Sequence, residues 1–165
     1  MNRTVAVVVM LLVVIAAWGL MYAGWRARSR RQSDVPSLPE APSALVDRAA
    51  DGAEATYVST TSAGDWLDRI TVHGLGVRSA ARVVVDPSGV LVARVGAPDV
   101  FIPAATLRDV RRETMRAGKA RPGGGLLVLE WTLGDRAVAT ALSPRRAAER
   151  DELEAAARGL LGVQQ

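Results

Sequence analysis

Residues 126–162 read LLVLEWTLGDRAVATALSPRRAAERDELEAAARGLLG. The first seven, LLVLEWT, are predicted to form a strand that places Leu127, Leu129 and Trp131 on one face. A Gly-Asp turn follows and RAVATAL alternates, so the stretch is predicted to begin with an antiparallel hairpin. The side chains expected on its buried face are Leu127, Leu129, Trp131, Val138, Thr140 and Leu142.

The same stretch ends in a predicted amphipathic helix. Ser143 is a suitable N-cap, and Pro144 fits the first helical position because a proline lacks the N–H that the first turn leaves unpaired. The apolar stripe of this helix consists of Leu153, Ala157, Leu160 and Leu161. Such a stripe needs an apolar partner, and the open end of a curved sheet is expected to provide one.

Further strands are predicted upstream, from residue 53 onward. AEATYVSTT (53–61) alternates, and SAARVVV (79–85) runs into Asp-Pro-Ser-Gly, which suits a type I turn. VLVARVG (90–96) is therefore expected to pair back as a hairpin. Residues 101–103 form a short apolar segment, and residues 62–76 are expected to be a loop.

Residues 105–116, ATLRDVRRETMR, have a different pattern. Leu107, Val110, Thr114 and Met115 are spaced more like the face of a helix than that of a strand. Periodicity alone favours a short helix here, and the choice between strand and helix stays open.

The N-terminal segment has the length and composition of a membrane span. Residues 5–24 carry no charge, and twenty helical residues extend about 30 Å, the thickness of the hydrocarbon core. Aromatic residues gather toward the end of this run, and Arg26, Arg28, Arg30 and Arg31 follow. By the positive-inside rule, we expect an uncleaved single-pass anchor in a bacterial inner membrane, with the N-terminus outside and the C-terminal domain in the cytoplasm.

Charge is distributed unevenly along the chain. The formal net charge is +4, but five of the 21 basic residues precede Gln32 and no acidic residue does, which leaves 16 basic against 17 acidic residues after it. Because the remainder is close to neutral, nucleic-acid binding is not expected. The four arginines after the span are predicted to contact lipid headgroups.

Three segments are therefore predicted: an anchor with a basic flank (1–31), a flexible linker (32–52) and a folded domain (53–165). The linker contains three prolines and no sustained apolar period. A short helix over residues 43–50 is the alternative for part of it. The chain has no cysteine, which agrees with a cytoplasmic domain, and its single lysine, Lys119, suggests the arginine-rich coding of an actinobacterium.

Six or seven strands followed by one helix resemble the bacterial pleckstrin-homology-like (PH-like) domains that are carried on membrane anchors. The resemblance rests on Ile102-Pro103 running into Leu107 and Val110, on the 127–131 strand before Gly134-Asp135, and on ELEAAARGLLG. WLDRI (66–70) and HGLGVRSA (73–80) are similar to an uncharacterised actinobacterial family of this kind. The resemblance implies a mostly β, PH-like barrel or sandwich capped by the C-terminal helix, with residues 107–116 as a strand.

No pattern of catalytic residues, metal ligands or cofactor-binding residues stands out. His73, the only histidine, is interpreted as a turn or edge residue beside Gly74. Gly74-Leu75-Gly76 lacks the third glycine of a dinucleotide fingerprint, and the segment before Lys119 lacks the first glycine of a P-loop. The chain is therefore not expected to be an enzyme, and no cofactor or metal is predicted.

One basic cluster is a candidate contact for an anionic lipid or an acidic partner: Arg108, Arg111, Arg112, Arg116, Lys119 and Arg121. A solvated basic surface is the simpler interpretation. Glu149, Asp151, Glu152 and Glu154 on the final helix are interpreted mainly as a solvated face. The function predicted is a membrane-tethered interaction module for a membrane-associated protein or anionic lipid. The alternative is an accessory subunit of a membrane transport or biosynthetic complex, assembled through Ala16, Ala17 and Gly19 of the anchor.

Overall fold

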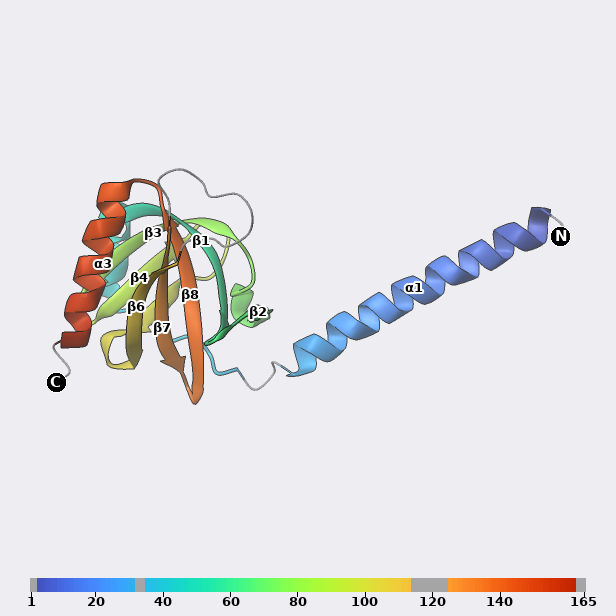
Figure 1. The fold of residues 1–165 in the computed structure, drawn as a ribbon, viewed down its shortest axis with the longest axis horizontal. Coiled ribbons are helices and arrows are strands. Elements are labelled where there is room, and N and C mark those ends of the chain that lie inside the picture. The colour runs from blue at the N-terminus through green and yellow to red at the C-terminus, as the bar shows by residue number, and fades with distance from the viewer. Residues whose placement is uncertain (1–2, 32–34, 114–124, 163–165) are drawn as a thin grey trace. The chain divides into compact units, whose positions relative to one another are not determined.

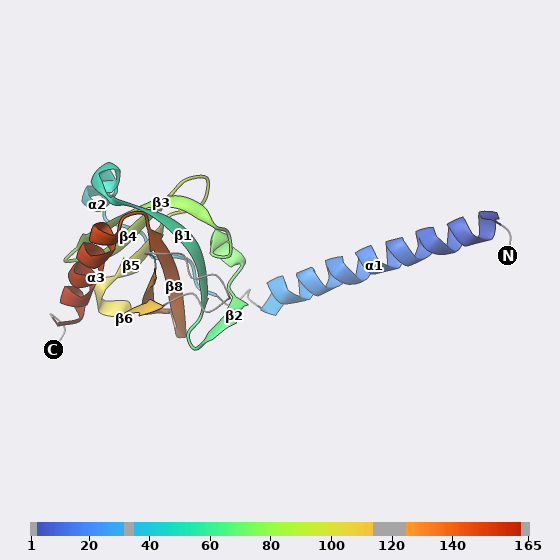
Figure 2. The same ribbon diagram turned by 45° about the horizontal axis from the view of Figure 1, so that its top comes forward.

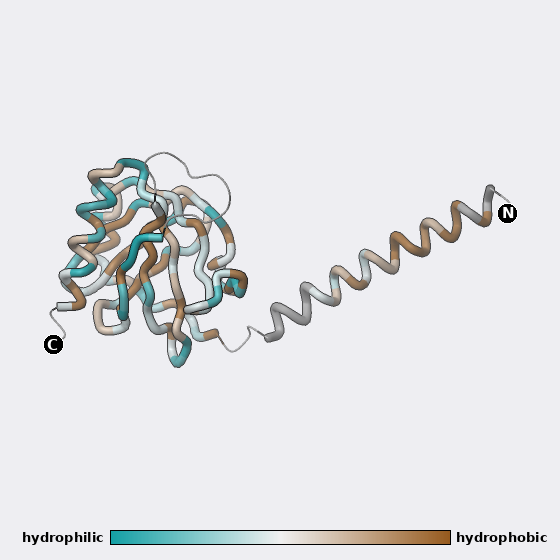
Figure 3. The backbone as a smooth tube through the Cα atoms, in the orientation of Figure 1, coloured by the Kyte–Doolittle hydropathy of each residue, from teal (hydrophilic) through white to brown (hydrophobic). Residues whose placement is uncertain are grey.

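The computed structural model describes residues 3–31, 35–113 and 125–162, and it contains two compact units, Met1–Asp34 and Val35–Gln165. The first unit is a single helix, α1 (Arg3–Arg31) (Figure 1). Residues Val7–Gly24 of α1 are long enough and apolar enough to cross a bilayer, and none of that stretch is buried (Figure 3). These properties are consistent with a membrane anchor.

The second unit is mostly β. Its described residues form eight strands: β1 (Ala53–Ser62), β2 (Asp65–Arg69), β3 (Ser79–Asp86), β4 (Gly89–Arg94), β5 (Val100–Pro103), β6 (Leu107–Glu113), β7 (Leu126–Leu133) and β8 (Arg136–Pro144). Two α-helices, α2 (Ser43–Asp47) and α3 (Ala147–Gly162), and three short 3₁₀ turns, η1 (Ala49–Asp51), η2 (Val72–Gly74) and η3 (Ala104–Thr106), complete it. The strand count is eight, against the six or seven expected.

All strand pairs are antiparallel and belong to one curved, open sheet. The order is β5-β4-β3-β1-β8-β7-β6, and β2 pairs with β1 alone. Helix α3 contacts β6, β3, β8, β1 and β4, so it packs across the inside of the curved sheet (Figure 1). The predicted fold class, a PH-like sheet closed by one C-terminal helix, is confirmed.

The core fills the space between the sheet and α3. Every residue predicted on the buried face of the β7–β8 hairpin is buried, and so are Leu153, Ala157 and Leu160 of α3, while Leu161 is partly buried. Each large apolar side chain buried in this way contributes roughly 1.5–3 kcal/mol to folding. The alternation of β7 and β8 thus fixes which face of the sheet receives the helix.

The segment left open between strand and helix is a strand, β6, as far as Glu113. Its pairing with β7 shifts register between Leu107 and Asp109. This irregularity places Leu107 and Val110 on the same buried face although they are three residues apart, which is why the sequence pattern looked helical. Thr114, Met115 and Arg116 lie outside the described residues.

Two boundaries differ from expectation. Ser143 and Pro144 end β8, paired with Thr56 and Ala55, and α3 begins only at Ala147. A further backbone hydrogen bond, from Arg145 N to Glu54 O at 2.8 Å, extends the pairing of β8 with β1. Residues 65–69, expected within a loop, form β2 against the end of β1.

Residues 35–52 also differ from the flexible linker that was expected. Val35 is buried in the main core, and Leu45 of α2 is only 2 % exposed. Leu45 covers Val84, Leu91 and Phe101 on the outer face of the sheet, and α2 lies beside β4 (Figure 2). The apolar outer face of β3, β4 and β5 explains why this segment packs rather than staying extended.

Candidate functional site

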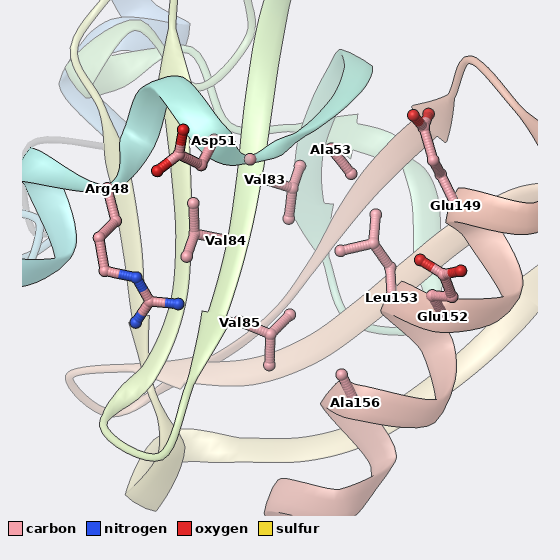
Figure 4. A pocket seen from close by; sticks show the side chains of 11 residues that line it. Arg48, Asp51, Ala53, Val83, Val84, Val85, Glu149, Glu152, Leu153 and Ala156 are labelled. Carbon is pink, nitrogen blue, oxygen red and sulfur yellow. The ribbon is translucent and has the colours of Figure 1, made fainter.

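A cleft opens between the first half of α3 and the end of β3 that follows Val83 (Figure 4). Its volume is about 390 Å³, and its apolar lining comes from Ala53, Val83, Val84, Val85, Leu153 and Ala156. Figure 4 shows Val83 and Val85 on the α3 side of the strand and Val84 on the side of Arg48 and Asp51. The end of β3 therefore lines the cleft, and residues that line the cleft lie on both sides of this strand.

The charged residues that line the cleft are mostly acidic. Asp51 belongs to η1, and Glu149 and Glu152 belong to α3. The one cation in the lining, Arg48, already donates to Asp86 at 3.0 Å. Bonds from Ser88 and, after them, from Arg48 lower the pKa of Asp86, so this pair stays charged at neutral pH. The cleft thus presents a net negative lining.

The predicted basic cluster is only partly brought together. Arg108, Arg111 and Arg112 all lie on β6, whereas Arg116, Lys119 and Arg121 fall outside the described residues. Arg111 is held by Glu130 at 2.5 Å, with Asp109 and Glu113 beside it, and its bond to Glu130 raises its pKa. Its charge is therefore matched within the sheet.

Arg112 is engaged in docking α3. Its Nε donates to Glu154, and its terminal nitrogen donates to Asp151 at 2.8 Å. Glu154 is 4 % exposed and also pairs with Arg158 at 2.9 Å, while Arg158 Nε donates to Val110 O. Arg111 and Arg112, two of the residues predicted to contact an anionic partner, thus form ion pairs within the domain. Arg108 donates to Thr132 and has no ion pair in the described part of the chain.

Sequence reasoning missed a buried polar network at the other end of the sheet. Arg94, 7 % exposed, stacks over the ring of Tyr57 at 3.9 Å and donates to four acceptors: Ser79 Oγ, Gly74 O, Val77 O and Pro98 O. Tyr57 in turn donates to Leu75 O at 2.7 Å. These bonds hold residues 74–79 against the sheet, so the role of the network is structural.

Burial of its hydroxyl raises the pKa of Tyr57, and its bond to Thr60 opposes this rise. The folded pKa exceeds the unfolded value of 10.0, so the tyrosine contributes fully to stability below pH 10 and loses that contribution as pH rises through the folded pKa. We expect urea unfolding in detergent to show a decline in stability above pH 10 that is smaller for Tyr57→Phe. Equal declines in the two proteins would contradict the expectation.

An exposed apolar pair lies on β2. Trp66 and Leu67 are 76 % and 66 % exposed. The β1–β2 turn adjoins β8, since Ala63 N donates to Ala137 O, and the neighbouring β7–β8 turn touches Pro36. This pair therefore lies near the end of the sheet where the chain enters the domain. The signal in the sequence was two adjacent large apolar residues in a polar segment.

His73 lies in η2, as a turn residue beside Gly74, with a positive φ of 53°. Its Nε2 is 3.2 Å from Val35 O, so it contacts the entering chain. Within residues 3–31, 35–113 and 125–162, no three histidines or carboxylates come together in a way that could hold a metal ion. The side chains of Arg26, Arg28, Arg30 and Arg31 are not among those described.

An open antiparallel sheet closed by a C-terminal helix is the architecture of PH-like domains. Residues 35–158 match the family described as Bacterial PH domain-like, and the chain belongs to this family. The match begins at residue 35 and so includes the segment that covers the outer face of the sheet. A search of curated proteins finds no match to this chain.

Proposed function

We propose that the chain is a membrane-tethered interaction module that presents a PH-like domain at the cytoplasmic face of a bacterial inner membrane. The observation that carries this proposal is the pairing of a PH-like domain with a helix long enough to span a bilayer, three residues apart. Ten residues, 25–34, separate the end of the apolar stretch from the buried Val35. The domain is held at the membrane surface, where its effective concentration toward membrane partners is high.

The arginines that follow the span support the orientation. Arg26, Arg28, Arg30 and Arg31 lie on the same side of the apolar stretch as the domain. Cytoplasmic flanks of membrane spans carry such an excess of arginine and lysine, and the same side chains attract anionic headgroups. This asymmetry supports a cytoplasmic position for the domain.

A protein is the favoured partner. Arg111 and Arg112, which would have bound an anionic lipid, have acidic partners within the domain. The exposed Trp66 and Leu67 and the acidic cleft offer protein-recognition surfaces instead. A second candidate, an accessory subunit assembled through the anchor, is supported by Ala16, Ala17 and Gly19, small residues on the exposed surface of α1.

The tether is tested by cell fractionation of the full chain and of a chain that lacks residues 1–31. We expect the full chain in the membrane fraction after a high-salt wash and the truncated chain in the soluble fraction, because about twenty apolar residues insert almost irreversibly. Protease added to intact cells should leave the domain uncut. Cleavage of the domain, or full-length protein in the soluble fraction, would contradict the proposal.

An anchor exchange separates the two candidate functions. Residues 5–24 are replaced by an unrelated apolar span of equal length, with Arg26–Arg31 kept, and the copurifying membrane proteins are compared. A tethered module retains its partners, because only proximity to the membrane is needed. Loss of the partners with the exchanged span would favour assembly through the helix instead.

A further inference from the structure

We propose that the cleft between α3 and the end of β3 binds an extended, arginine- or lysine-bearing segment of another membrane protein. The choice of that partner rests on the proposed function, whereas the chemistry of the cleft does not. Three features of the cleft carry the inference: an unpaired strand edge, an apolar lining and acidic residues on both sides.

The first feature is the strand edge. β1 pairs with β3 from Ala53↔Val83 to Tyr57↔Ser79, whereas β3 continues to Asp86 and pairs with β4 from Ala81 to Asp86. Residues 84–86 therefore have a strand neighbour on one side only. An extended peptide can add to such an edge through main-chain hydrogen bonds, and the pockets beside it then select alternate side chains.

The second feature is the lining of the two walls. Val83 and Leu153 are buried, while Val85 and Ala53 are partly buried and Ala156 is exposed on the helix wall. Ala53 and Ala156 are small, so space is left between α3 and the strand (Figure 4). An apolar side chain of the added segment would be covered on that side.

The third feature is charge. Asp51 stands on one side of the strand, and Glu149 and Glu152 stand on the other. One oxygen of Glu149 accepts from Arg146 at 3.2 Å, while Oε2 is buried and has no hydrogen-bond partner among the described residues. A buried carboxylate oxygen without a donor is costly, and a cation from a bound segment would supply one. The cleft thus selects a basic peptide and disfavours an acidic one.

Other membrane proteins carry basic segments at the cytoplasmic membrane surface, where the proposed function holds this domain. Their cytoplasmic flanks carry extra arginine and lysine within about 15–20 residues of the span. A domain that begins ten residues after the apolar stretch meets these flanks at high effective concentration. A basic juxtamembrane segment in extended conformation therefore fits both the edge and the charge of the cleft.

The test uses the full chain in detergent and a fluorescent peptide in which valine and arginine alternate. Glu152→Lys reverses one charge of the cleft, and Asp135→Lys makes the same change in the β7–β8 turn; both side chains are exposed, and neither has an ion pair among the described residues. We expect Glu152→Lys to weaken binding by at least about tenfold and Asp135→Lys by less than about twofold. A peptide with glutamate in place of arginine should not bind.

Backbone amide exchange gives an independent readout. Residues 84–86 should become protected when the valine–arginine peptide binds, while β6 remains unchanged. Failure of the wild-type chain to bind, equal losses in the two lysine variants, or unchanged exchange at residues 84–86 would each overturn the inference. Self-association of the chain that Glu152→Lys abolishes would assign the cleft to a second copy and would also overturn it.

The two proposals fail separately. If the peptide does not bind but fractionation places the full chain in the membrane, only the cleft inference is lost. If the peptide binds but the chain is soluble, the cleft keeps its chemistry and the tethered partner is wrong.

Discussion

Replacing Arg94 by methionine is expected to lower the free energy of unfolding by on the order of 3–5 kcal/mol. The methionine fills much of the volume but removes the arginine donor from four acceptors, and of these Gly74 O keeps the amide of Val77. It also removes the cation that stacks on Tyr57. Urea unfolding of the full chain in detergent, followed by tryptophan fluorescence, measures the change.

Two variants show whether the geometry of Arg94 matters. Arg94→Lys keeps the charge but not the planar fork, so most of the loss should remain. Arg82→Met removes an exposed arginine that pairs with Glu54 at 3.2 Å, and it should cost less than about 1 kcal/mol. If Arg94→Met cost no more than Arg82→Met, the role assigned to the network would be wrong.

Gly89→Ala is expected to destabilise the domain by on the order of 2–4 kcal/mol. Gly89 follows the turn between β3 and β4 and has a φ of 151°, and a Cβ at this position would lie 2.2 Å from Ile102 O and 3.0 Å from Ala104 N. Both neighbours are backbone atoms of β5 and the turn after it, so they cannot move away without breaking the β4–β5 pairing.

Gly96→Ala is the matched control. Gly96 also has a positive φ, 74°, but no atom lies within 4 Å of its would-be Cβ. Only the strain of the left-handed conformation remains there, about 1 kcal/mol. Thermal unfolding of both variants separates the two costs, and equal shifts in melting temperature would show that contact with β5 plays no part.

Much of the fold could be predicted because alternation and turn residues are local signals. The β7–β8 hairpin, the β3–β4 hairpin and the apolar stripe of α3 all follow from residues that are near one another in the sequence. The start of α3 could not be placed, because Ser143 and Pro144 favour a helix locally and pairing with β1 favours a strand. Here a long-range contact outweighed a local preference.

The candidate site depended more heavily on long-range contacts. Arg94 looks like any strand arginine until the fold brings the carbonyls of residues 74–77 around it. The cleft combines residues 48–53, 83–85 and 149–156, which are far apart in the sequence. Nothing in the sequence indicates that β3 continues beyond the point where its pairing with β1 ends. The acidic residues Glu149 and Glu152 were noticed, but the strand that faces them was not.

The packing of residues 35–52 has a mechanical consequence. Force applied to α1 would reach the domain first at Val35, which precedes every strand. Leu45 is the next buried side chain along the chain. Detachment of this segment would leave the sheet pairing intact and free residues 35–52, which span up to about 60 Å when fully extended. The same change would expose Leu91 and Phe101, an apolar surface on the outer face of the sheet that Leu45 otherwise covers.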